Sequence, residues 1–162
     1  MASAPDPSIP LNPLQGDARP VEDWVTTFHL VLVVLDPYTY ESSWLIDTAG
    51  RILQNFSEAD CRAAWLVTGT PEEAQQFLGP WGERLLTFTD PDRALVSSVG
   101  LERLPALLHL NQLLEVEGVA EGWQPDQWSE VTSHLSTLMS WSKPTIPAPG
   151  DPTPYVGSPA AG

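Results

Sequence analysis

The chain has 162 residues, of which 42% are hydrophobic, so it is long enough for one domain with a sizeable core and too short for two ordinary domains. Its 21 acidic and 7 basic residues give a net charge of −14, and the few positive charges are scattered along the chain. We therefore expect neither nucleic acid nor an anionic membrane as a partner, because both are bound through basic patches that neutralise phosphate groups.

The sequence predicts a cytoplasmic protein. The N-terminal residues lack the basic and apolar regions of a secretory signal. The longest apolar run, residues 30–35, is too short to span a bilayer. The single cysteine, Cys61, cannot form an internal disulfide, which agrees with a reducing compartment.

Proline divides the chain into three parts. Of the 17 prolines, five lie in residues 1–22 and six lie in residues 144–162. We expect residues 1–22 and 143–162 to be disordered tails around a domain at residues 23–142, because Pro, Ala, Gly and Ser bury too little apolar area to offset the entropy of ordering. An alternative for the C-terminal tail is a polyproline II docking peptide with Tyr155 and Val156 as its anchors.

The first half of the predicted domain alternates strands and helices. Residues 30–35 contain no polar side chain, which is typical of a parallel strand buried on both faces. An amphipathic helix of about 16 residues should follow from Tyr40, since apolar residues repeat there at helical spacing. After a second strand at residues 62–68, Thr70-Pro71-Glu72-Glu73 predicts a helix start with a capping hydroxyl, an early proline and a glutamate three residues after the cap.

The second half of the predicted domain ends in a hairpin and a helix. A short strand at residues 85–88 and a helix that starts at Asp90-Pro91 and ends at Gly100 come first. Strands at residues 106–110 and 114–120 are so close in sequence that they must pair antiparallel. The last helix starts at Pro125, and its predicted core stripe consists of Trp128, Val131, Leu135, Leu138 and Met139. Together, these predicted strands and helices indicate an α/β fold, with a mixed central sheet flanked by helices on both faces.

This order of elements resembles the thioredoxin-like superfamily, and within it the peroxiredoxin and TlpA-like branch, over residues 29–139. The resemblance is carried by the apolar strand with its helix-opening turn, by residues 85–100, by the strand entry at Leu104-Pro105 and by residues 121–128. It implies that Pro105 is the family's cis-proline and lies beside the turn. It also implies that Thr39 and Ser42 occupy the two cysteine positions of the family's Cys-x-x-Cys motif.

The turn Tyr38-Thr39-Tyr40-Glu41-Ser42 contains no cysteine. A serine hydroxyl is barely ionised near neutral pH and has no reversible sulfenic or disulfide state, so no redox cycle can run at Ser42. We expect no catalytic residue, no cofactor and no disulfide reductase or peroxidase activity, but a binding or scaffolding module that holds a segment of a protein partner or a small ligand. The predicted binding groove consists of Tyr38, Thr39, Tyr40, Glu41, Ser42, Leu104 and Pro105.

Two other functions stay open. One is a non-redox, thiol-dependent transferase or thiol-binding enzyme, in which Thr39 or Ser42 hydrogen-bonds a thiolate held at the start of the helix. The other is a redox protein that acts through Cys61 alone, although single cysteines of this kind are more often small buried side chains. The histidines His29, His109 and His134 lack the spacing of metal ligands and do not suggest convergence, so no metal site is expected.

Overall fold

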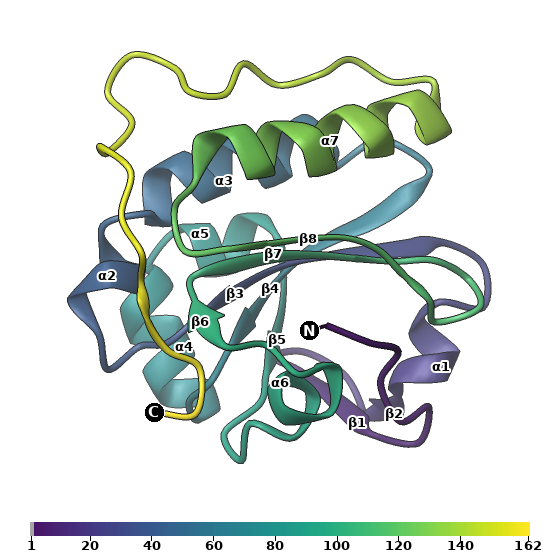
Figure 1. Cartoon of the computed structure of the whole chain (residues 1–162). Coiled ribbons are helices and arrows are strands. Elements are labelled where there is room, and N and C mark those ends of the chain that lie inside the picture. Colours follow the sequence, from purple (N-terminus) through teal and green to yellow (C-terminus); the bar gives the residue numbers. More distant parts are fainter. Residues whose placement is uncertain (1) are drawn as a thin grey trace.

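The computed structural model describes residues 2–162, which are built around a seven-stranded mixed sheet (Figure 1). The strand order is β2-β1-β5-β4-β3-β7-β8. Strands β3 (His29–Leu35), β4 (Cys61–Val67) and β5 (Leu86–Thr89) run parallel, and β7 (Ala106–Leu110) and β8 (Val116–Glu121) form an antiparallel hairpin beside β3. The strand predicted from the uninterrupted apolar run is therefore central, and the mixed sheet predicted from the sequence is confirmed.

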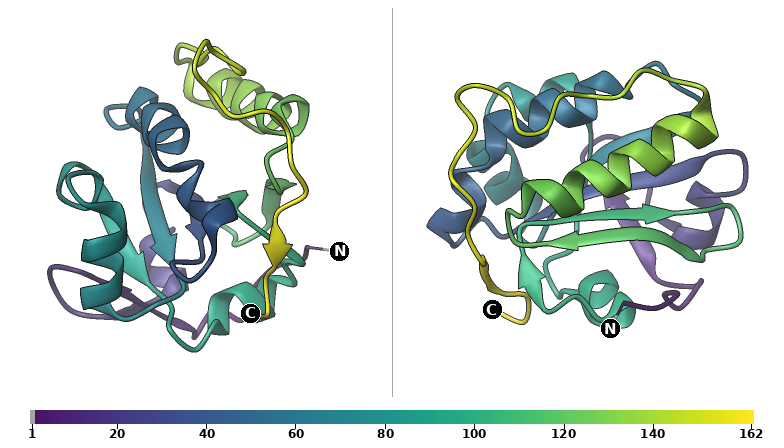
Figure 2. Two further views of the ribbon diagram at one scale, coloured as in Figure 1. Left: turned by 90° about the vertical axis from the view of Figure 1, so that its left-hand side faces the viewer. Right: turned by 45° about the horizontal axis from the view of Figure 1, so that its top comes forward.

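Helices cover both faces of this sheet (Figure 2). The helices are α1 (Val21–Trp24), α2 (Tyr40–Ser43), α3 (Ile46–Asn55), α4 (Pro71–Leu78), α5 (Trp81–Arg84), α6 (Ala94–Val99) and α7 (Pro125–Met139). The remaining strands are β1 (Pro10–Pro13) and β2 (Arg19–Pro20), which extend the large sheet, and β6 (Arg103–Leu104) and β9 (Ser158–Pro159), which form a separate pair. None of the helices within residues 2–162 has both the length and the apolar character needed to cross a membrane.

The side chains of β3 point alternately into two hydrophobic cores. Val31, Val33 and Leu35 pack with residues of α3, α4 and α7, whereas Leu30, Leu32 and Val34 pack with residues of α1 and α6. Burying one such side chain stabilises the fold by about 1.5–3 kcal/mol. Because both faces of the strand lie in a core, no position on β3 between Leu30 and Leu35 favours a polar residue.

The helix starts agree only in part with the sequence predictions. The capping box at Thr70 is present, since its hydroxyl accepts from the Glu73 N–H and the Glu73 carboxylate accepts from the Thr70 N–H. The single helix predicted from Tyr40 is two helices, α2 and α3. Trp44 lies between them and is 56% exposed instead of lying on the buried stripe.

Two further differences concern α6 and α7. Helix α6 starts at Ala94 rather than at Pro91, because the Asp90 carboxylate accepts hydrogen bonds from the N–H groups of Ala94, Leu95 and Val96 and so caps the helix from a preceding turn. Leu138, predicted on the core stripe of α7, is 45% exposed.

The N-terminal segment packs against the sheet, which differs from the predicted disordered tail at residues 1–22. Strand β1 pairs with β5, the outermost of the three parallel strands, and Leu11 and Val21 are fully buried. Average composition favours disorder, but backbone hydrogen bonds to a free sheet edge need no particular side chain. A few well-spaced apolar residues then supply the burial that orders the segment.

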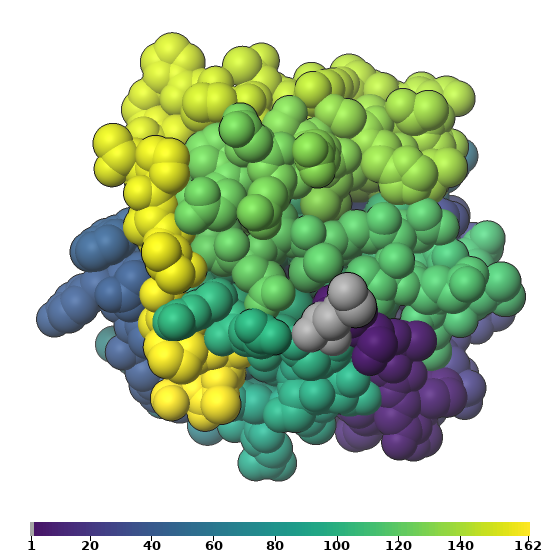
Figure 3. All heavy atoms as spheres, in the orientation of Figure 1, coloured from purple at the N-terminus to yellow at the C-terminus, as the bar shows by residue number. Residues whose placement is uncertain are grey.

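The C-terminal segment also packs on the domain, so the predicted disordered tail at residues 143–162 differs from the structure as well. Residues 141–162, here called the C-terminal strap, run from the end of α7 along α3 and past α2 to β6 (Figures 1 and 3). Arg51 of α3 forms an ion pair with Asp151 at 2.9 Å and donates to the Thr145 carbonyl at 2.8 Å. The folded unit therefore extends beyond residues 23–142 at both ends.

Candidate functional site

Buried polar residues gather where β3, β4 and β5 end. Because these strands are parallel, their carboxyl ends meet at one edge of the sheet, the usual place for binding sites in open α/β sheets. Asp36, which follows β3, is buried and forms an ion pair with Arg93 at 3.0 Å. Arg93 also donates to the Ala160 carbonyl at 2.7 Å. This further hydrogen bond matters because the ion pair alone does not recover the cost of removing two charges from water.

Thr39 and Ser42 both hydrogen-bond the backbone of Asp36. Ser42 is fully buried, and its Oγ accepts from the Asp36 N–H at 2.9 Å. The Thr39 hydroxyl donates to the Asp36 carbonyl at 3.2 Å. Both hydroxyls therefore hold the turn in shape, and both already have a protein partner.

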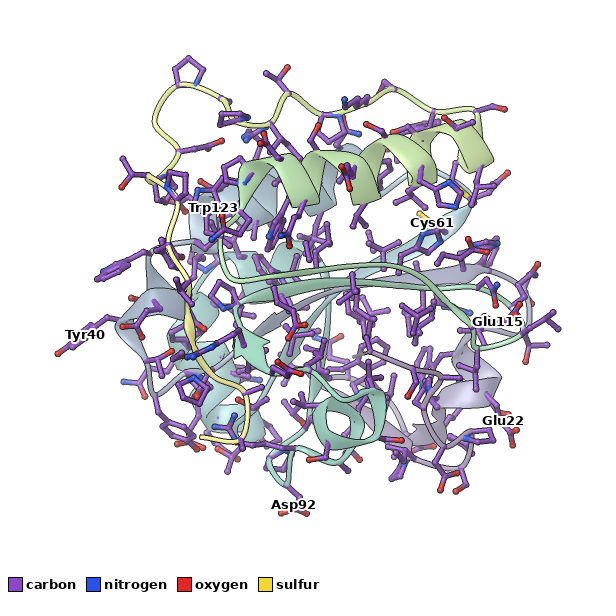
Figure 4. The ribbon with its side chains drawn as sticks, viewed as in Figure 1. Glu22, Tyr40, Cys61, Asp92, Glu115 and Trp123 are labelled. Carbon is purple, nitrogen blue, oxygen red and sulfur yellow. The ribbon has the colours of Figure 1, made fainter. Side chains whose placement is uncertain are left out.

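Two aromatic side chains on this turn and one that follows α2 face solvent. Tyr38, Tyr40 and Trp44, here called the aromatic rim, are 63%, 79% and 56% exposed, and Tyr40 points away from the domain in Figure 4. The Tyr38 hydroxyl donates to Glu73 at 2.6 Å, and this hydrogen bond raises the pKa of Tyr38. The rim is thus an exposed apolar surface next to carboxylates.

The peptide bond between Leu104 and Pro105 is cis, as the resemblance implies. Both residues are buried, and β6, which contains Leu104, pairs antiparallel with Ser158–Pro159 of the strap. The strap therefore covers this side of the predicted groove. Of the seven predicted groove residues, Tyr38 and Tyr40 are exposed and Thr39 and Glu41 are half-buried. The other three, Ser42, Leu104 and Pro105, are buried.

Tyr155 connects the strap to the turn. Its hydroxyl donates to the Glu41 carbonyl at 2.5 Å, and its ring packs edge-on against Trp44 with ring centroids 5.5 Å apart. Burial raises the pKa of Tyr155. Of the two predicted docking anchors, Tyr155 is docked within its own chain and Val156 is 63% exposed.

Cys61 lies at the opposite end of the strands from the turn (Figure 4). It starts β4 and pairs in register with His29, so the length of a seven-residue strand, about 20 Å, separates it from the turn. Burial, reinforced by the charge of Asp60, raises the pKa of its thiol to about 11. Very little thiolate is therefore present at neutral pH.

The three histidines come together, contrary to the prediction that they do not converge. His29 Nδ1 and His109 Nε2 lie 2.8 Å apart, and the rings of His109 and His134 have centroids 6.1 Å apart. His134 in turn contacts Glu117 at 2.9 Å. Sequence spacing missed this cluster because β3 and β7 are neighbours in the sheet although far apart in the chain.

His109 is the buried member of this cluster. It is fully buried, and its Nδ1 has no hydrogen-bond partner within residues 2–162. Burial, together with the neighbouring His29, lowers the pKa of His109 to about 4. Within the same described part of the chain, no group of three His, Cys, Asp or Glu residues is placed to hold a metal ion.

Comparison with solved structures identifies the architecture. A thiol:disulfide interchange protein DsbE of Chlorobium tepidum matches with a TM-score of 0.68 and 11% identity over 86% of this chain and 98% of that one. Peroxiredoxin Q of Xanthomonas campestris matches with a TM-score of 0.65 and 14% identity over 86% and 96% of the two chains. The fold is thioredoxin-like. This thioredoxin-like chain matches no family model and no curated protein, so the comparisons bear on its fold alone.

A third thioredoxin-like structure, a secreted disulfide oxidoreductase of Mycobacterium tuberculosis, matches with a TM-score of 0.56 and 12% identity over 70% of this chain and 83% of that one. All three similar structures are named for redox proteins, whereas the turn after β3 has no cysteine here. The sequence did not single out Arg93 as a site residue, because its ion pair with Asp36 joins residues 57 positions apart.

Proposed function

We propose that this chain is a thioredoxin-like binding module without redox thiols, and that it binds a protein partner through the aromatic rim and the adjoining groove. The observation that carries the proposal is the cysteine-free turn, which lies with the three exposed aromatic side chains of the rim at the edge where the parallel strands end. Tyrosine and tryptophan are the residues most enriched among binding hot spots, since they bury a large area at a low cost in conformational entropy.

The charge around the rim indicates what kind of partner fits it. Glu41 lies on α2, Glu73 bonds Tyr38, and Asp47 lies nearby on α3, where it bonds Trp81. Two basic side chains of this region, Arg51 and Arg93, are already paired with carboxylates, and Arg103 is exposed on β6 beside Leu104. A partner segment that presents apolar and basic groups would therefore be complementary, because arginine and lysine favour both carboxylates and aromatic faces.

The two other functions receive less support. The hydroxyls of Thr39 and Ser42 already have backbone partners, which disfavours a transferase that would use them to hold a thiolate. The raised pKa of Cys61 and its distance from the turn disfavour a one-cysteine redox protein. We also retain the expected cytoplasmic location, on the ground of the lone cysteine, and the expected absence of a nucleic-acid partner, on the ground of the net charge.

Quantitative affinity capture from the native host tests the proposal. Tyr40→Arg replaces the most exposed rim residue, and Leu113→Arg is a matched control, because Leu113 is 80% exposed in the hairpin between β7 and β8. Tyr40→Arg should weaken capture of the wild-type partners about 30-fold, the loss of an aromatic hot spot of about 2 kcal/mol, whereas Leu113→Arg should leave it unchanged. Equal capture by both variants and the wild type would remove the rim as the interface.

A further inference from the structure

The C-terminal strap lies in the groove as an extended segment that is hydrogen-bonded at two places along its length. Ser158–Pro159 pairs antiparallel with Arg103–Leu104, and the Ala160 N–H donates to the Glu102 carbonyl at 2.9 Å. Tyr155 exchanges two backbone hydrogen bonds with Trp123, of 2.9 and 3.0 Å. In Figure 3 the strap fills the space between α2 and the residues around β6. The groove thus holds an extended backbone through main-chain hydrogen bonds.

Two glycines let these backbones approach each other. Gly157 has a φ of +89°, and a Cβ added to it would lie 2.5 Å from the Leu104 carbonyl oxygen and 3.3 Å from Gly122 Cα. Gly122 has a φ of +71°, and its added Cβ would collide with the Val156 carbonyl. Neither contact is with the flexible end of a side chain, so neither can move aside easily. A strand bound here needs glycine at the position of Gly157.

The other strap residues define what the groove accepts. Tyr155 packs on Trp44 and bonds Glu41, and Ser158 is buried with its hydroxyl donating to the Leu104 carbonyl at 3.4 Å. Ala160 is 1% exposed, and its carbonyl accepts from Arg93. Val156 and Pro159 face solvent. From position 155 to position 160, the groove therefore accepts an aromatic residue, any residue, glycine, a small residue, any residue and a small residue.

We propose that this groove is an exchangeable strand-binding site that selects that pattern, and that residues 155–160 occupy it in competition with a partner segment of the same pattern. The inference rests on the proposed function, since it names the segment that the same site binds. A covalently attached segment has an effective concentration of the order of millimolar, so it lowers the apparent affinity for any free competitor. Tail segments held by a few main-chain hydrogen bonds open more readily than the core.

The test uses the full chain with one glycine changed. Gly157→Ala adds the colliding Cβ, and Gly150→Ala is the matched control, because Gly150 also has a positive φ, +91°, but has open space around it. A fluorescein-labelled peptide of residues 153–162 should bind Gly157→Ala about tenfold or more tightly than it binds the wild type or Gly150→Ala, since only the first chain releases its strap. The same peptide with alanine in place of its glycine should bind none of the three.

Hydrogen exchange at the Trp123 amide, which donates to the Tyr155 carbonyl, reports release of the strap independently. It should accelerate in Gly157→Ala and not in Gly150→Ala. Unchanged protection in Gly157→Ala would overturn the selection for glycine, and a released strap without tighter peptide binding would overturn the exchangeable site. Tight peptide binding together with unaltered partner capture by Tyr40→Arg would leave the strand site in place while refuting the rim.

Discussion

His109 should make the folded protein sensitive to acid between pH 7 and pH 5. The residue is fully buried, and the groups facing it are His29 on β3, Glu117 on β8 and His134 on α7. Burial and the neighbouring His29 lower its pKa from 6.5 to about 4, while the Glu117 carboxylate opposes the shift. The folded state therefore keeps His109 neutral at a pH where the unfolded chain takes up a proton.

The size of the effect follows from this shift. Below pH 6.5 the unfolded state binds a proton that the folded state accepts only near pH 4, so the free energy of unfolding is largest above pH 6.5 and falls as the pH drops through this window. The slope is at most about 1.4 kcal/mol per pH unit, and the loss over the whole window is about 3 kcal/mol. Between pH 7 and pH 5 the loss is about 2 kcal/mol.

Urea unfolding of the wild type and of His109→Gln at both pH values measures this contribution. Glutamine keeps a hydrogen-bonding group beside His29 but does not titrate, so the difference between the two proteins should change by about 2 kcal/mol from pH 7 to pH 5. Other titrating groups, such as Asp90, whose pKa is raised by burial, cancel in this difference. His134→Gln should retain most of the pH dependence, because the His134 side chain is 47% exposed.

Parallel stability curves for the wild type and His109→Gln would refute the reasoning. So would an NMR titration that gives His109 a pKa near 6.5 in the folded protein. Either result would mean that water or a rearranged partner reaches the Nδ1 atom that has no hydrogen-bond partner within residues 2–162.

Three further predictions concern other parts of the chain. Arg93→Met should lower the free energy of unfolding by about 3–5 kcal/mol, because it leaves Asp36 charged and buried, and adding Asp36→Asn should recover part of the loss in urea titrations. Alkylation of Cys61 by iodoacetamide should be about a hundredfold slower in the native protein than in denaturant, since its pKa is raised from 9.0 to about 11, and equal rates would contradict its burial. Gly50→Ala should cost about 1–3 kcal/mol, because its Cβ would lie 2.6 Å from the Trp81 ring, and a shift in melting temperature of less than a degree would show that the ring moves freely.

Local patterns in the sequence determined most of the central fold. The apolar run of β3, the capping box at Thr70, the proline at the start of α7 and the short connection between β7 and β8 each act through neighbours in the chain. The rules for buried strands, helix caps and hairpins concern residues that are close in sequence, so these elements can be predicted without the tertiary structure. The cysteine-free turn was likewise visible from the residues alone.

Only the tertiary structure decided the candidate site's surroundings. His29 contacts His109 across 80 residues of sequence, Thr48 donates to Asp151 across 103 residues, and Tyr155 reaches Glu41 across 114 residues. Composition predicts the average tendency of a segment to bury apolar area, so it assigned the proline-rich ends to disorder. The N-terminal end is ordered by strand pairing and by the burial of Leu11 and Val21. The C-terminal end is ordered by hydrogen bonds, one ion pair and a close approach at glycine, and all of these contacts join residues far apart in the sequence.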